Sequence, residues 1–351
     1  MLKCGAGTGN GAAAGEPSAP GLSSEVRSWL TARSSHADDW PVKELVAAKG
    51  DTKVSVVLPA RNEAGTVGSI VAMVQEALMG HEALVDELLV VDSCSTDATA
   101  EVAAAAGARV VHQDEVLAHL PRLAGKGEAL WKGLAATSGD VVAFLDADVV
   151  GCSPKFVPGL LGPLLLDHSV GYVKGFYRRP LVRDEYTEPD GGGRVTELVA
   201  RPLLNLYWPK LAGFVQPLAG EYAGRRELLE AVPFATRYGV EVGLLIDLLQ
   251  LAGLDALAQV DLGHRRHRHQ SNEALAHMST QIMLTVFARL QRHRRSVLPR
   301  AATGLAQFRH TDADESTGRE VVVTDIDVPE RPPLATVLRD GARDLAVSRP
   351  L

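Results

Sequence analysis

Cysteine is scarce in this sequence, where Cys4, Cys94 and Cys152 are the three present among 351 residues. Three scattered cysteines form neither a disulfide framework nor a Cys-X-X-Cys metal motif, as is typical of proteins from a reducing compartment. Long apolar runs are absent too, because no uninterrupted stretch approaches the roughly 20 residues that span a bilayer. The first 20 residues are rich in glycine, alanine and proline and lack the apolar core of a signal peptide. These absences predict a cytoplasmic protein without a membrane segment.

An excess of positive charge is missing as well. The formal net charge is −7, which argues against nonspecific binding to nucleic acid. The strongly basic run GHRRHRHQ, residues 263–270, has no interleaved aromatic side chains, on which nucleic-acid bases would stack. Its histidine spacing fits no zinc finger, and no cysteine pair lies near it. We therefore expect neither a nucleic-acid surface nor a zinc site in this run.

What is present is an alternation of apolar strands and amphipathic helices between residues 53 and 150. Apolar residues make up 46% of the chain, which is ample for a core. Strands that alternate with helices of ten to fifteen residues indicate a parallel sheet with helices on both faces, and such sheets bind ligands at the carboxyl ends of their strands. The expected strands are 53–60, 85–93, 108–113 and 140–150, and the expected helices are 66–80, 97–107 and 125–139.

The segment DVVAFLDADVV is an apolar strand-like run that carries two carboxylates near its end, Asp146 and Asp148. Side chains two residues apart on an extended strand point to the same face, so both carboxylates can reach one ligand. Hard oxygen donors of this kind suit Mg²⁺ or Mn²⁺. The alternative is a strand that reaches water and ends on two solvated aspartates.

Polar residues also follow the earlier strands. Glu63 follows the first strand, and Asp92 and Ser93 end the second, where a base and a ribose could lie. Turn chemistry and helix capping are the alternative explanation, which we favour for residues 95–97. Lys126 stands between two glycines at a helix start, where backbone amides and an ammonium can hold a phosphate. The spacing is not that of a Walker A loop, and an ordinary turn is the alternative.

The order of these segments resembles a known enzyme family. VSVVLPARNEAGTV, ELLVVDSCSTDAT, GKGEALWKGLAATSGD and VVAFLDADV together resemble the nucleotide-sugar half of glycosyltransferases of the GT-A fold. GGGRVTELVARPLL, QPLAGEYAGRRELL, YGVEVGLLIDLL and AQVDLGHRRHRH look like the actinobacterial glucosyl-3-phosphoglycerate synthases. The resemblance covers about residues 53–280. It implies an α/β fold with a GT-A-like, Rossmann-type, mostly parallel sheet flanked by helices and a C-terminal helical extension.

The resemblance also implies a reaction and a donor site. The reaction would be the retaining transfer of glucose from UDP-glucose to the 2-hydroxyl of 3-phosphoglycerate, assisted by a divalent cation. On the donor side, the residues that match the family's nucleotide-sugar contacts are Pro59, Ala60 and Glu63 (uridine), Ser93 (base and ribose), Lys126 (diphosphate) and Asp146 (ribose or sugar).

For the metal, Asp148 and His267 match the family's ligands, and the ion would be Mg²⁺ or Mn²⁺. For the acceptor, Gly193, Arg194 and Thr196 match the family's contacts, and His269 stands at a further acceptor position. A glycine lets the backbone approach the ligand, the arginine offers a planar fork for phosphate or carboxylate, and a helix start favours an anion. A flexible connection with a surface arginine is the alternative. The chain departs from the family pattern at His269, where the family has Asn, so acceptor binding would become sensitive to pH.

Two carboxylates compete for the place nearest the anomeric carbon. Glu241 follows a glycine at a predicted helix start, which could equally be a first-turn glutamate favoured by the helix dipole, and Glu221 is its competitor. A double displacement needs a carboxylate nucleophile, whereas attack from the face of the leaving group does not. For this family we favour the second route. Glu241 would orient the sugar. The leaving diphosphate and a backbone oxygen near Leu218 would assist the acceptor hydroxyl.

The rival functions are mannosyl-3-phosphoglycerate synthesis from GDP-mannose, a sugar nucleotidyltransferase, and a silent subunit that binds nucleotide sugars. The nucleotidyltransferase would have a glycine-rich loop after the first strand, which LPARNEAG is not.

We expect a homodimer that pairs through its C-terminal segment. The predicted organisation is a disordered lead (1–25), a helical segment (26–52), a nucleotide-sugar half (53–150), an acceptor half (151–271) and a C-terminal region (272–351). This last region would consist of a helix at about 272–294 and a tail with a possible edge strand.

Overall fold

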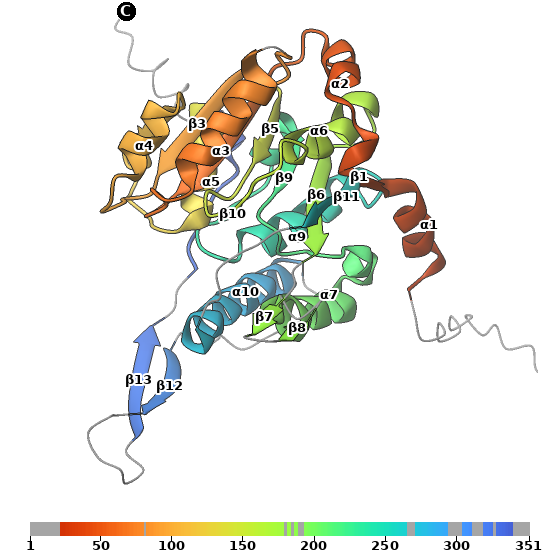
Figure 1. Ribbon diagram of the computed structural model, residues 1–351. Coiled ribbons are helices and arrows are strands. Elements are labelled where there is room, and N and C mark those ends of the chain that lie inside the picture. Colours follow the sequence, from red (N-terminus) through yellow and green to blue (C-terminus); the bar gives the residue numbers. More distant parts are fainter. Residues whose placement is uncertain are drawn as a thin grey trace, which may run out of the picture.

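An eight-stranded, mostly parallel sheet runs through the centre of the protein (Figure 1). The structure, a computed structural model, describes residues 22–80, 82–178, 181–183, 186–188, 193–264, 271–293, 304–310, 319–325 and 328–339. β9 runs antiparallel to both of its neighbours, and the other pairs in this sheet are parallel. In sheet order the strands are β1 (Ser34–His36), β11 (Leu257–His264), β6 (Tyr172–Arg178), β9 (Tyr222–Arg225), β5 (Val141–Phe144), β2 (Val54–Ala60), β3 (Glu87–Asp92) and β4 (Arg109–His112).

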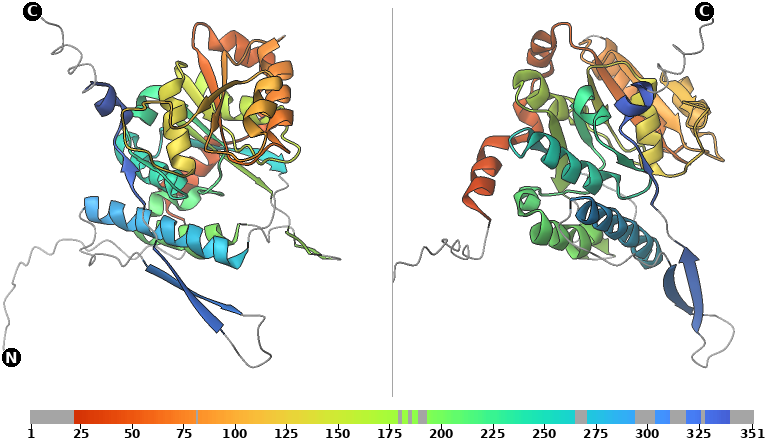
Figure 2. Two further views of the ribbon diagram at one scale, coloured as in Figure 1. Left: turned by 90° about the vertical axis from the view of Figure 1, so that its left-hand side faces the viewer. Right: turned by 180° about the vertical axis from the view of Figure 1, so that it is seen from behind.

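Helices cover both faces of the sheet (Figures 1 and 2). They enclose two apolar cores. The first core lies under α2 (Val42–Lys49), α3 (Val67–Val74), α4 (Thr99–Ala105) and α6 (Phe156–Leu166). The second lies under α1 (Ser24–Arg33), α5 (Lys126–Ala136), α7 (Arg201–Tyr207), α8 (Arg226–Glu230), α9 (Val240–Ala252) and α10 (Asn272–Arg292). This two-layer cover explains why β2 and β3 are buried along nearly their whole length.

Short irregular helices and small sheets complete the fold. The 3-10 helices are η1 (Ala37–Asp39) and η4 (Pro209–Gly213), and the π-helices are η2 (Gln75–Gly80) and η3 (Thr196–Ala200). Among the described residues, three antiparallel pairs lie outside the main sheet: β7 (Leu181–Arg183) with β8 (Tyr186–Glu188), β10 (Phe234–Ala235) with β14 (Glu330–Arg331), and β12 (Gly304–His310) with β13 (Arg319–Asp325). Within the described residues, no helix has the length and apolar character to cross a membrane.

The predicted α/β fold is confirmed, and the structure adds detail at three segments outside its centre. α1 begins at Ser24, two residues before the expected helical segment, and Ser23 caps it. The segment 26–52 contains most of α1 and all of α2, and it also contains β1, which pairs with β11 at the edge of the main sheet. In the tail, β13 pairs with β12 in a separate ribbon. The pairing of β1 with β11 joins segments far apart in the chain, which local periodicity cannot predict.

Candidate active site

The carboxyl ends of β2, β3 and β4 lie side by side and carry the first group of predicted donor residues. The amide of Ser93 donates to the Ala60 carbonyl at 2.8 Å, and the Ser93 hydroxyl donates to the Gln113 side chain at 2.8 Å. Pro59 precedes Ala60 at the end of β2, where its missing N–H would face β5, whose pairing with β2 ends at Val57. The structure therefore brings Pro59, Ala60 and Ser93 together.

The loop after β2 is fixed by the loop after β3. The amide of Glu63 donates to the Thr99 hydroxyl at 2.8 Å, and the amide of Asn62 donates to Ser95 Oγ at 3.0 Å. Asp97 accepts from the amide of Thr99, the first residue of α4, at 3.0 Å, although the N-cap residue of that helix is Ala98. Ser95 thus braces the Glu63 loop rather than capping its own helix.

The two aspartates that follow β5 lie in a loop, not on a strand as predicted. β5 ends at Phe144, two residues before Asp146, because its pairing with both β2 and β9 stops there. Burial nevertheless alternates, with Ala147 buried, Asp146 half-buried and Asp148 exposed. The buried Thr66 hydroxyl donates to the Ala147 carbonyl at 2.7 Å and holds the loop against the start of α3. The two aspartates are therefore more accessible than the buried Ala147 between them.

Lys126 is the centre of the site. It is the first residue of α5, and its ammonium lies 2.5 Å from Asp146 Oδ1 and 2.8 Å from Glu241 Oε1. Burial opposes its charge, but the two carboxylates outweigh this effect and raise the pKa of Lys126 well above its ordinary value. The lysine is therefore an ammonium at any physiological pH. It is also 20% exposed and can reach a ligand that enters from solvent.

The space beside Asp146 depends on a glycine. A Cβ at Gly220 would lie 2.1 Å from Asp146 Oδ2, which is well inside van der Waals contact. The loop before β9 therefore needs a glycine to approach this carboxylate. Leu218 is half-buried in the same loop, and Glu221, which follows Gly220, is fully buried.

Glu241 and Glu221 occupy different places. Glu241 is the second residue of α9, is 4% exposed and contacts Lys126 directly. Glu221 precedes β9, and its carbonyl accepts from the amide of Gly175 at 2.9 Å. Of the two, Glu241 is the one whose carboxylate is held by the lysine of the site.

The predicted acceptor residues lie at the start of a helical segment. Gly193 has a φ of 80°, a left-handed conformation that favours glycine. Arg194 donates to the Asn272 side chain at 2.8 Å, which brings it to the start of α10, and Thr196 begins η3 and is buried. His267 and His269 lie outside the residues that the structure describes. Within the described part of the chain, no cluster of three or more His, Cys, Asp or Glu side chains forms a metal site.

The sequence predictions missed a group of buried polar residues behind the site. Lys174 on β6 is 1% exposed, lies 3.4 Å from the Tyr172 hydroxyl, and has its ammonium 4.5 Å from the centre of the Tyr222 ring. Burial, joined by repulsion from Lys126 and opposed by the nearby carboxylates, lowers the pKa of Lys174 to about 7. A lysine inside an otherwise apolar strand was the signal that could have revealed it.

Tyr238 is a second residue that was missed. Partial burial and the charges of Glu241, Asp146 and Asp148 raise its pKa, while Lys126 lowers it. The side chain is 44% exposed, so it borders the site and also reaches solvent. Its position just before α9 gave no distinct signal in the sequence.

Comparison with known proteins identifies the family. Residues 55–231 match the model of the family described as Glycosyl transferase family 2. The glucosyl-3-phosphoglycerate synthase of Mycolicibacterium smegmatis is 50% identical over 309 residues, which cover 88% of this chain and 98% of that protein.

Two solved structures extend the likeness to the whole fold. The glucosyl-3-phosphoglycerate synthase of Mycobacterium tuberculosis, in complex with Mn²⁺, UDP-glucose and phosphoglyceric acid, is 45% identical with a TM-score of 0.75, over 87% of this chain and 98% of that one. The mannosyl-3-phosphoglycerate synthase of Rubrobacter xylanophilus is 40% identical with a TM-score of 0.82, over 91% of this chain and 100% of that one. The chain is therefore a glycosyltransferase of the GT-A-like fold and belongs to the family of glucosyl-3-phosphoglycerate synthases.

Proposed function

We propose that this enzyme transfers glucose from UDP-glucose to the 2-hydroxyl of 3-phosphoglycerate and forms glucosyl-3-phosphoglycerate with retention at the anomeric carbon. The observation that carries the proposal is the ammonium of Lys126, held between Asp146 and Glu241 at the carboxyl edge of the sheet. A partly exposed cation at a helix start suits the diphosphate of a nucleotide sugar. The relative from Mycobacterium tuberculosis that binds UDP-glucose and phosphoglyceric acid supports the choice of substrates.

The donor would lie across the ends of β2, β3 and β5. Pro59, Ala60, Glu63 and Ser93 would hold the uridine, and Asp146 would contact the ribose or the sugar. Lys126 would exchange part of its contact with the two carboxylates for the diphosphate. Glu241, thereby freed, would orient the hydroxyls of glucose.

A divalent cation, Mg²⁺ or Mn²⁺, fits this edge of the site. Asp148 presents an exposed carboxylate there, and hard oxygen donors of this type suit either ion. Asp148 together with His267 would hold the ion. When bound, the cation would neutralise the diphosphate and stabilise the charge on the departing UDP.

The acceptor would be held by Gly193, Arg194, Thr196 and His269. Its 2-hydroxyl would attack the anomeric carbon from the face on which the diphosphate departs, so that no carboxylate nucleophile is needed. The bond from the anomeric carbon to UDP breaks, the new glycosidic bond forms, and the hydroxyl proton passes to the leaving diphosphate. The backbone oxygen of Leu218 would accept a hydrogen bond from the attacking hydroxyl.

GDP-mannose is the second candidate donor. The observation that favours it is the likeness to the mannosyl-3-phosphoglycerate synthase of Rubrobacter xylanophilus. The two candidates share the acceptor and the metal, so they differ in the base and the sugar alone.

The test is to follow nucleoside diphosphate release by the purified protein with each donor, with and without 3-phosphoglycerate and Mg²⁺. We expect acceptor-dependent release of UDP, and no acceptor-dependent release with any donor would overturn the proposal. Asp148→Ala should abolish metal-dependent turnover. Arg194→Ala should chiefly raise the KM for 3-phosphoglycerate. Asn272→Ala, which removes the hydrogen bond between Asn272 and Arg194 but retains the arginine, is the matched control.

We also propose a cytoplasmic homodimer that pairs through the segment from residue 272 onward. The scarcity of cysteine, three among 351 residues, is in keeping with a reducing compartment. Leu198 and Leu206, both more than 70% exposed, lie on η3 and α7, and η3 contacts α10, so apolar surface is available next to that segment. Light scattering of the purified protein measures the oligomeric state directly.

A further inference from the structure

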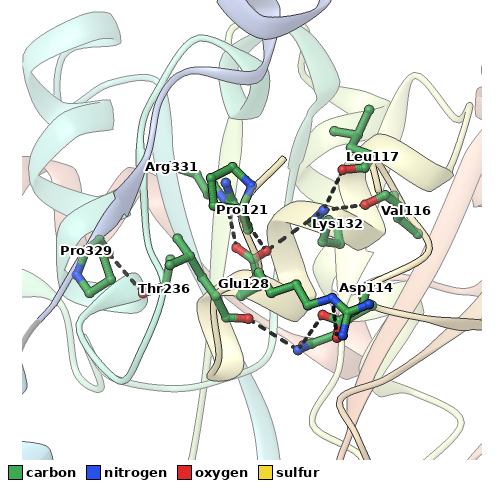
Figure 3. Close-up of polar contacts among 12 residues, drawn as sticks. Asp114, Val116, Leu117, Pro121, Glu128, Lys132, Thr236, Pro329 and Arg331 are labelled. Carbon is green, nitrogen blue, oxygen red and sulfur yellow. Dashed lines mark hydrogen bonds and ion pairs between the residues drawn. The ribbon is translucent and has the colours of Figure 1, made fainter. Parts of the chain in front are cut away.

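One guanidinium contacts the chain both before and after the lysine of the site. Arg331 on β14 donates to the Pro121 carbonyl at 2.6 Å, and it donates to both oxygens of Glu128 at 2.7 and 2.8 Å (Figure 3). Pro121 lies five residues before Lys126, and Glu128 lies two residues after it. Arg331 therefore holds the chain on both sides of this lysine.

The contacts of Arg331 are almost closed to water. Glu128 is 1% exposed and Arg331 is 5% exposed. The guanidinium also lies 5.2 Å from the centre of the Trp131 ring, which belongs to the next turn of α5. Bidentate pairs between arginine and carboxylate are geometrically specific as well as strong. The pair therefore defines where the first turn of α5 can lie.

Backbone contacts continue from β14 to the same turn. β14 pairs with β10, and the Thr236 amide donates to the Pro329 carbonyl at 3.1 Å. On its other side, the Thr236 carbonyl accepts from the amide of Glu128 at 3.0 Å. A Cβ at Gly127 would lie 1.8 Å from the Ala235 carbonyl oxygen, so β10 and the first turn of α5 are in direct contact.

We propose that Arg331 is a positioning residue for the donor site, because it places the first turn of α5 so that Lys126 meets the diphosphate. The inference rests on the proposed transfer reaction and assigns a role in it to the C-terminal segment. Arg331 touches neither Asp146 nor Glu241 in any described contact, so it acts through the backbone of α5. Its loss should weaken donor binding and leave acceptor binding unchanged.

The test measures kcat and both KM values for Arg331→Met, and the affinity for UDP with Mg²⁺ by calorimetry. We expect the KM for the donor and the Kd for UDP to rise by roughly 2- to 30-fold, the range for substitutions that touch no ligand. The KM for 3-phosphoglycerate should stay within about twofold of the wild-type value. Arg331→Lys keeps the charge but not the fork, and it should give an intermediate rise with better folding.

Two controls separate positioning from loss of stability. Glu330→Gln breaks the ion pairs of the neighbouring residue with Arg289 and Arg292 on α10, and it should leave the donor KM unchanged. Glu128→Met with Arg331→Met removes both charges of the bidentate pair, while Lys132, whose ammonium lies 4.0 Å from Glu128, keeps its backbone partners Val116 and Leu117. Much of the stability should therefore return without the fixed turn. The proposal would be overturned if the double variant recovered the wild-type KM for the donor together with its stability. It would also be overturned if Arg331→Met changed the KM for the donor and the KM for the acceptor equally.

Failure of the proposed function gives a different result. If wild-type protein releases no nucleoside diphosphate in the presence of acceptor, the transfer reaction is wrong. The UDP affinity of the Arg331 variants still tests the inference in that case. Unchanged UDP affinity in Arg331→Met and Arg331→Lys would overturn it independently of turnover.

Discussion

Two ion clusters share the first turn of α5, and they differ in their access to water. The Lys126 side chain is 20% exposed and faces the side chains of Asp146 and Glu241, which are 18% and 5% exposed. Glu128, two residues later, is 1% exposed and is bound by Arg331. An ion pair that water and ligands can reach can change partners, whereas a buried bidentate pair cannot do so without leaving a charge unpaired. The first cluster is thus suited to binding a ligand and the second to holding the helix.

Of the substitutions that test this contrast, Glu128→Ala should cause the largest loss of stability. It leaves the guanidinium of Arg331 buried without its carboxylate, and breaking a buried pair in this way removes about 3–5 kcal/mol of stability. Urea unfolding measures the loss. If the loss is below about 1 kcal/mol, the second cluster does not hold the helix as we describe.

Lys126→Met should lower kcat/KM by about 10²–10³-fold, the range for loss of one charge-stabilising group from a catalytic site. Its loss of stability should be smaller than that of Glu128→Ala, because water can reach Asp146. Lys126→Arg, which keeps the positive charge, should recover part of the activity. Steady-state kinetics and urea unfolding of the same samples compare the two effects, and full activity in Lys126→Met would contradict the assignment.

Lys174→Met should change how stability depends on pH. The pKa of Lys174 is lowered to about 7 in the folded protein, against about 10.4 for an unfolded lysine. Between these values the unfolded chain binds the extra proton, so the free energy of unfolding rises with pH from about 7 to 10. Below pH 7 both states are protonated and this contribution is flat.

The substitution should therefore remove part of that slope, and the variant should gain most relative to wild type at pH 7 and below. Urea midpoints between pH 6 and 10 measure the difference. A slope that is identical in both proteins would show that Lys174 does not titrate in this range.

Lys210→Ala should have the smallest effect. Lys210 pairs with Glu25 at 2.6 Å, and both side chains are more than half exposed. Surface substitutions of this kind usually change stability by no more than about 0.5 kcal/mol. The variant sets the baseline in urea unfolding, and a loss as large as that of Glu128→Ala would remove the distinction between open and closed ion pairs.

The positions of several site residues could be predicted from the sequence. Ala60, Ser93 and Lys126 were assigned to strand ends and a helix start, and the structure places them there. Such positions follow from periodicity and from the rule that ligands bind at the carboxyl edge of a parallel sheet. The strand that was expected to carry Asp146 was too long, because it stops where its partners on both sides diverge.

By itself the sequence determined the alternation of strands and helices, the family, and the polar residues at the strand ends, because all of these depend on local patterns. Tertiary structure alone decided that Lys126 lies between Asp146 and Glu241, 115 residues further on, and that Arg331 pairs with Glu128 across 203 residues. A buried charge must find its partner wherever the folded chain brings one. Local sequence patterns do not specify which distant residue becomes that partner.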